Sequence, residues 1–219
     1  WFARNPRLKQ LYVTATPNRT DGVGLKNVCD SVAYRMGILE GIEEGYLVNV
    51  QQRYVMVKGL DLTECKTKKG GDLADGDLEN LMRGAGKDEQ AKLDEGPIHE
   101  QVSVTIAEAA GKQVLFFASG KQHARDICNA FNSYGVKACC VLDDTPGPFR
   151  SKYFREFKSR EIQVLVNCGV ATEGFDADCV EVIANARPTK SISLYTQIIG
   201  RGTRPLDKIA RLISRLRDE

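Results

Sequence analysis

The chain has 219 residues, of which 42% are hydrophobic and 27% are charged, and its formal net charge is only +2. A chain of this length can bury a core large enough to be stable without disulfide bonds or metal ions. Every apolar run is much shorter than the roughly 20 residues that a membrane-spanning helix needs, so the sequence excludes the membrane, collagen-like and fully disordered classes.

The first part of the chain has an irregular pattern. A short apolar run at 11–13 is typical of a buried strand, and the sequence Thr-Ala-Thr-Pro follows it. Hydrophobic spacing predicts three further elements, namely helices over 21–36 and 38–46 and a strand over 54–57. Residues 59–96 are rich in Gly, Asp, Lys and Glu and carry one weak helical pattern around Leu78. We interpret 59–96 as a polar insert or linker between two packed units.

From residue 97 onward the pattern is regular, because apolar strands alternate with helices. Helices are predicted over 97–110, 121–134, 149–159 and 191–200, and strands over 114–118, 136–142, 164–166 and 180–184. Continuous apolar strands between helices favour a parallel sheet that is covered on both faces. Ligands of such sheets bind at the carboxyl ends of the strands, so the residues that follow each strand are the candidates for function.

Cysteine and charge are both distributed unevenly along the chain. The seven cysteines form no C-x-x-C pair, so we expect reduced and mostly buried thiols. The two histidines, His99 and His123, stand apart from one another, and no metal site is predicted. Residues 187–219 contain eight Lys or Arg against three acids, whereas 72–95 contain eight acids against three bases. Either one surface meets phosphate and another avoids it, or both are solvated faces.

Two segments at the strand ends carry the strongest chemical signals. Residues 164–176 read VLVNCGVATEGFD, in which small residues let backbone amides approach an anion and Asp176 can accept from a ribose hydroxyl. An ordinary strand-to-helix turn would also fit. Residues 197–204 read QIIGRGTR, and on a helix or at its end Arg201 and Arg204 would point the same way. Two convergent arginines can neutralise the charge that develops in phosphoryl transfer.

Together, four segments resemble motifs III, IV, V and VI of the superfamily-two helicases, in particular the DEAD/DEAH-like group related to the helicase subunit of type III restriction enzymes. The matching residues are 14–17, 114–119, 164–176 and 197–204, and the resemblance covers 11–58 and 97–205. It implies two RecA-like α/β lobes, each with a three-layer parallel sheet, with ATP between the lobes and a nucleic-acid strand across both. Residues 1–58 would then end the first lobe, and 97–219 would form a second lobe that we expect to be truncated.

The resemblance also implies roles for individual residues. Thr14 and Thr16 are similar to residues that couple hydrolysis to lobe movement. The residues that resemble contacts to the strand backbone are Ser119, Gly120, Asn167 and Cys168, although many relatives carry Thr where Cys168 stands. Gly174 and Asp176 resemble nucleotide-binding residues. The arginine motif that faces the γ-phosphate is similar to Gln197, Arg201 and Arg204.

Some expected motifs are missing from the sequence. The phosphate-binding pattern G-x-x-x-x-G-K-[ST] does not occur. Residues 88–91 read DEQA, like a DE-box, but they follow no apolar strand. We therefore expect the ATP phosphate loop and the Mg²⁺ ligands to lie upstream of Trp1, and the chain by itself to be inactive. The resemblance implies part of a cytoplasmic ATP-dependent helicase or translocase; it leaves both DNA and RNA open as the strand, and of the two we favour DNA. Two alternatives are a non-catalytic nucleic-acid-binding module and a small-molecule Rossmann enzyme, although the latter would need a G-x-G-x-x-G that is absent.

Overall fold

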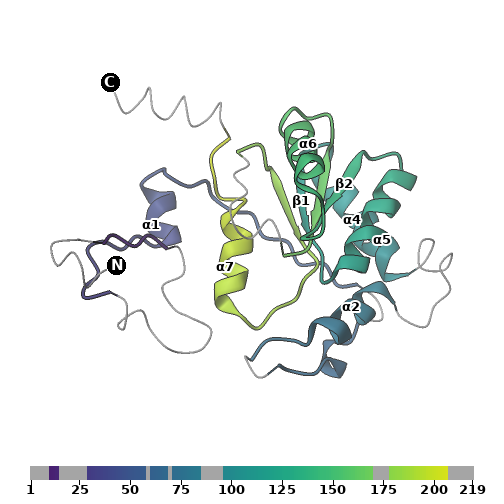
Figure 1. The fold of residues 1–219 in the computed structure, drawn as a ribbon, viewed down its shortest axis with the longest axis horizontal. Helices are drawn as coiled ribbons and strands as arrows, with labels where there is room; N and C mark the ends of the chain where they lie inside the picture. The colour runs from purple at the N-terminus through teal and green to yellow at the C-terminus, as the bar shows by residue number, and fades with distance from the viewer. Residues whose placement is uncertain are drawn as a thin grey trace.

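A computed structural model of the chain describes residues 10–14, 29–57, 60–68, 71–84, 96–169 and 178–206. Its centre is a four-stranded sheet in the order β2-β3-β1-β4, in which every pairing is parallel. The strands are β1 (Val114–Phe117), β2 (Ala138–Val141), β3 (Val164–Asn167) and β4 (Val182–Asn185). Phe117 lies opposite both Asn167 and Asn185, so the strands end level and their carboxyl ends share one edge (Figure 1).

Helices cover both faces of this sheet. They are α4 (Pro97–Ala109), α5 (Lys121–Ser133), α6 (Gly147–Lys158) and α7 (Ile192–Gly200). Because side chains alternate along a strand, Val114 and Phe116 pack with α4 and α5, whereas Leu115 and Phe117 pack with α6 and α7. The predicted three-layer α/β arrangement is confirmed, and each predicted helix and strand after residue 97 is present within a few residues of its expected bounds.

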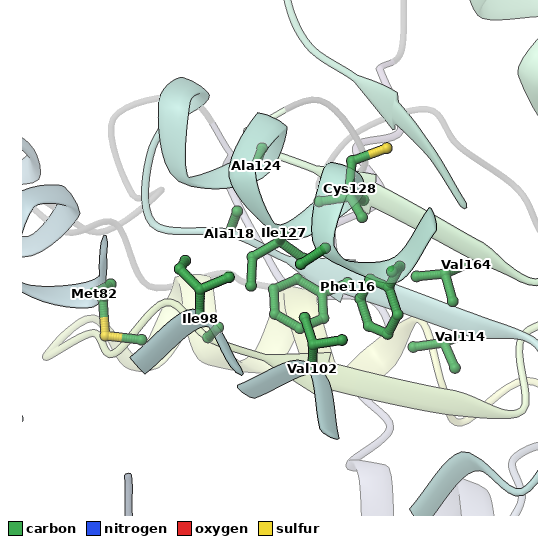
Figure 2. Close-up of a cluster of buried hydrophobic side chains, with 14 of the residues drawn as sticks. Met82, Ile98, Val102, Val114, Phe116, Ala118, Ala124, Ile127, Cys128 and Val164 are labelled. Carbon is green, nitrogen blue, oxygen red and sulfur yellow. The ribbon is translucent and has the colours of Figure 1, made fainter. Parts of the chain in front are cut away.

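The larger of the two cores lies under α4 and α5. Figure 2 shows Ile98 and Val102 of α4, Ile127 of α5 and Phe116 of β1 gathered in it. The Phe116 ring is 1% exposed and meets the Phe131 ring edge-on, with 5.9 Å between the ring centroids. Burying a side chain of this size contributes about 1.5–3 kcal/mol to the free energy of unfolding, so packing in this layer stabilises the sheet.

Part of the predicted polar insert belongs to the same core. The helix α2 (Asp75–Arg83) follows a short 3-10 turn, η3 (Leu62–Glu64), and packs against α4 and α5. Its Leu78 and Met82 side chains are 1% and 4% exposed, and Figure 2 shows Met82 at the border of the cluster. The two residues lie at i and i+4, a helical stripe that the many acids around them conceal. Residues 71–84 thus pack on the lobe, and the boundary at 96/97 stays a prediction.

The first part of the chain departs most from expectation. The helix α1 (Ile38–Glu43) forms inside the predicted range 38–46. The described part of the predicted helix 21–36 is not helical, and the predicted strands at 11–13 and 54–57 are absent from the described residues. Val13, Val32 and Met56 are 90%, 73% and 95% exposed, so these segments lack the packing and the neighbouring strand that an isolated short element needs.

Two plain findings concern membranes and thiols. In the part of the chain that the structure describes, no helix is long and apolar enough to cross a membrane. All seven cysteines are free thiols. Burial raises the pKa of the Cys128 thiol to about 11, so it is protonated at neutral pH.

Candidate functional site

The turn between β1 and α5 is fixed by a buried histidine. The Ser119 amide donates to His123 Nδ1 at 3.1 Å, and the Ser119 hydroxyl lies 2.7 Å from the same nitrogen. Since Nδ1 accepts, the neutral ring carries its proton on Nε2, which lies 3.0 Å from Gln101 Oε1. Gln101 in turn donates to the carbonyl of Met82 at 3.0 Å. The chain of bonds fixes Ser119 to α4 and α2 and leaves its side chain buried.

Glu79 of α2 supplies the cap that the first turn of α5 lacks. The N-cap residue, Gly120, has no side chain of its own. The Glu79 carboxylate accepts instead from the amides of Gln122 and His123, at 2.6 and 3.0 Å. A Cβ at residue 120 would stand 2.1 Å from the carboxyl carbon of Glu79, so glycine makes room for the carboxylate. A negative group at this end of a helix is stabilised by its unpaired amides and by its dipole.

The carboxyl end of β3 lies beside this turn. Asn167 is fully buried and donates from Nδ2 to the carbonyl of Phe116 at 3.0 Å, which ties the ends of β3 and β1 together. Cys168 is half-buried, and burial raises the pKa of its thiol. Gly169 has φ of +75°, a left-handed conformation that favours glycine, so the chain can turn sharply after the strand.

Basic residues after β4 meet the acids of the segment that leads into α2. The Asp72 carboxylate accepts from the Thr189 hydroxyl at 2.9 Å and from the Lys190 amide at 2.8 Å. Arg187 lies 3.4 Å from Asp75. Partial burial would raise the pKa of Asp72, but hydrogen bonds from the Lys190 and Leu73 amides and from Thr189 outweigh burial and hold the pKa below its usual value. The acidic and basic segments of the sequence are therefore in contact.

The predicted arginine motif lies at the end of α7. Arg201 is the C-cap of this helix, and Arg204 follows in an exposed turn, so the motif occupies the helix end, one of the two placements that its spacing allowed. The buried Thr203 fixes this turn, because its carbonyl accepts from the Val48 amide at 2.8 Å. A Cβ at Gly202 would stand 2.7 Å from Cγ1 of Ile183, so glycine lets the turn pack closely on β4. Gln197 is half-buried on α7.

The structure brings together some of the predicted site residues. Ser119, Gly120, Asn167 and Cys168 share one edge of the sheet, at the ends of the neighbouring strands β1 and β3. Thr14 is exposed in a segment without regular structure. The remaining three predicted residues, Thr16, Gly174 and Asp176, lie outside the described residues.

The three acids that contact this edge, namely Asp72, Asp75 and Glu79, were not identified from the sequence. Their negative charge was the available signal, but their pairing with segments far along the chain has no local pattern. Within the described residues, no group of three or more His, Cys, Asp or Glu side chains could hold a metal ion.

The buried histidine predicts how stability depends on pH. Burial lowers the pKa of His123 to about 3, below the roughly 6.5 of an unfolded histidine. The contribution of the neutral ring to the free energy of unfolding is therefore fully present above about pH 6.5. It is lost as the pH falls toward 3, by up to about 1.4 kcal/mol per pH unit. Urea unfolding at pH 7, 6 and 5 should show a steeper loss for the wild type than for His123→Asn. Equal slopes for His123→Asn and wild type would refute the assignment.

Comparisons with known proteins agree on one family. Residues 98–205 match the family model described as the helicase conserved C-terminal domain. A Saccharomyces cerevisiae protein that carries the name ATP-dependent helicase IRC3 is 32% identical over 191 residues, which cover 87% of this chain and 26% of that protein. A Schizosaccharomyces pombe protein, named a mitochondrial ATP-dependent helicase, is 30% identical over 88% of this chain and 30% of its own length. The chain thus spans less than a third of these two relatives.

More distant relatives include proteins named for RNA. ATP-dependent RNA helicase DDX42 of Homo sapiens is 30% identical over 43% of this chain and 10% of its own length. Among solved structures, a DEAD box protein from Methanococcus jannaschii matches with a TM-score of 0.44 and 22% identity, over 48% of this chain and 30% of that chain. The Hef helicase domain of Pyrococcus furiosus matches with a TM-score of 0.40 and 23% identity, over 53% and 25%.

Proposed function

Because residues 98–205 belong to the helicase conserved C-terminal domain family, we propose that this chain supplies the second RecA-like lobe of an ATP-dependent helicase or translocase that tracks along DNA. The observation that carries the proposal is the level carboxyl edge of the sheet, where helix amides, a positive-φ glycine and basic side chains follow adjacent strands. The names of the two yeast relatives, which match 87% and 88% of the chain, support an ATP-driven enzyme over a non-catalytic binding module.

The proposed strand contacts are made to phosphates rather than to bases. The side chains of Ser119 and Asn167 form hydrogen bonds within the protein, so their proposed role is to hold the backbone at the ends of β1 and β3 in place. The phosphates would meet the groups around them, namely the backbone at Gly120 and Cys168 and the ammonium of Lys121. This ammonium lies 2.6 Å from Asp143 and 3.4 Å from Asp144, so a phosphate would replace these carboxylates as its partner. Contacts to phosphates do not depend on the nucleotide sequence, as tracking along a nucleic-acid strand requires.

The proposed role of Gln197, Arg201 and Arg204 is to face the ATP phosphates across the cleft between the lobes. Arginine suits this role because its charge is permanent and its planar fork can contact two phosphate oxygens. Thr14 and Thr16 would couple hydrolysis to lobe movement, and Gly174 and Asp176 would contact the nucleotide. Bound Mg²⁺ would neutralise charge on the phosphates, and its ligands are proposed to lie in an upstream lobe, as the absence of a phosphate-loop motif in this sequence suggests.

DNA is proposed as the strand, although relatives named for RNA also occur. The cytoplasmic location stays a prediction, and the relative from S. pombe is named mitochondrial.

Strand binding by this chain tests the nucleic-acid part of the proposal. Fluorescence anisotropy with single-stranded DNA and RNA of equal length should show binding that weakens as salt rises, with DNA bound more tightly. Lys121→Ala should reduce the slope of log affinity against log salt by about 0.7, because one phosphate contact is lost. Lys112→Ala, at the opposite edge just before β1, is the matched control and should keep the slope. Undetectable binding of both strands at low salt would contradict the proposal.

A further inference from the structure

Three acids of one segment already bind the edge where phosphates are proposed to bind. We call residues 71–83 the acidic segment; it contains Asp72, Asp75 and Glu79 and includes α2. Glu79 accepts from two amides at the start of α5, and Asp72 accepts from an amide and a hydroxyl after β4. Because β1 and β4 are neighbours that end level, both contacts lie along the same edge, and Figure 1 shows α2 beside it.

The groups that receive these carboxylates are those that proteins use for phosphate. Backbone amides at a helix start, a guanidinium and a hydroxyl all bind phosphate oxygens. In this structure they hold carboxylate oxygens, with Arg187 3.4 Å from Asp75 as the charged pair. The absence of a Cβ at residue 120 brings the Glu79 carboxylate closer to the backbone than any side chain there would allow. A carboxylate and a phosphate cannot occupy this position together.

The helix α2 of the acidic segment is packed firmly on the lobe, but its Glu79 side chain is able to move. Leu78 and Met82 are buried in the core between α4 and α5, and Arg83 forms a 2.7 Å ion pair with Asp126 of α5. Moving the whole helix would expose this apolar surface to water. The Glu79 side chain can instead leave α5 by rotation about its own bonds, while α2 stays in place.

We propose that the acidic segment is an autoinhibitory contact, in which the carboxylates of Asp72 and Glu79 occupy phosphate positions and a nucleic-acid strand must displace them to bind. The inference rests on the proposed function, since it requires that a strand binds this edge. The contact lowers the affinity of the free lobe for any polyanion, and a strand held at several points by the whole enzyme displaces it more readily.

The contact between the acidic segment and this edge is tested by comparing how tightly charge-matched variants bind single-stranded DNA. Asp72→Ala/Glu79→Ala should bind single-stranded DNA about five- to tenfold more tightly than wild type at low salt. Glu108→Ala/Glu161→Ala removes the same charge near the other edge, before β1 and β3, and should change the affinity less than twofold. Glu79→Gln keeps an oxygen that can cap α5 but loses the negative charge, so it should show an intermediate gain. Equal affinities for the test pair and the control pair would overturn the inference.

A second measurement needs only the wild-type protein. Carbodiimide labelling of carboxylates, read by mass spectrometry, should show that Glu79 and Asp72 become more reactive when saturating DNA is added, while Glu108 does not change. Unchanged or reduced labelling of Glu79 with DNA bound would overturn the inference and leave the proposed function standing. If neither the wild type nor any variant binds a strand, the proposed function fails and the inference fails with it.

Discussion

Replacing Arg204 with alanine in the full-length protein is expected to lower kcat for ATP hydrolysis about 10³-fold or more, the magnitude associated with an arginine that stabilises transition-state charge. KM for ATP should change much less, because the contact strengthens mainly as charge develops in the transition state. The exposed position of Arg204, beyond the end of α7 in a turn that Thr203 fixes, suits a side chain that meets a partner surface. Steady-state kinetics at saturating strand measure both constants.

Two further variants sharpen this prediction. Arg204→Lys should recover only part of the activity, since an ammonium lacks the planar fork that bridges two oxygens. Arg155→Ala removes an exposed arginine of α6 and should leave kcat unchanged. A folded Arg204→Ala protein that hydrolyses ATP within about threefold of wild type would show that Arg204 is an ordinary surface residue.

The second large effect is the loss of ATP hydrolysis, which we expect to be complete in the 219-residue chain alone. Its sequence contains no phosphate-loop motif, so we expect the chain alone to lack the groups that position the phosphates and hold Mg²⁺. Arginines without that positioning should supply little of the catalysis in phosphoryl transfer. Steady-state assays of the purified chain with Mg²⁺, ATP and single-stranded DNA should give the background rate. Turnover clearly above background, proportional to chain concentration in a preparation free of other ATPases, would contradict the account.

The lobe after residue 97 could be predicted because local pattern and tertiary structure agree there. Strands such as Val114–Phe117 are buried on both faces and so read as continuous apolar runs, which sets the fold class as parallel α/β. The resemblance to superfamily-two helicases came from four short segments, and the family match over 98–205 confirms it for the three segments inside that range. The parallel α/β sheet expected of such a lobe is present in the structure.

The remaining features depend on contacts that no local pattern records. The pairing of Glu79 with the start of α5 joins residues more than 40 positions apart, and the glycine at 120 reads from sequence as an ordinary turn residue. The weak helix predicted around Leu78 is present, but the acidic composition around it hid that Leu78 and Met82 are buried in the core. Conversely, the apolar residues around Val32 suggested a helix, but the structure gives them no surface to pack against. The roles of Thr16, Gly174 and Asp176 stay predictions.

Coupling between a nucleic-acid strand and ATP hydrolysis is tested by measuring kcat of the full-length protein with and without single-stranded nucleic acid. A strand should raise kcat, and DNA should do so more than RNA. The stimulation should shrink as salt rises because it depends on phosphate contacts. An ATPase rate that is the same with DNA, with RNA and with neither would show that this lobe does not couple a strand to hydrolysis, and would contradict the account.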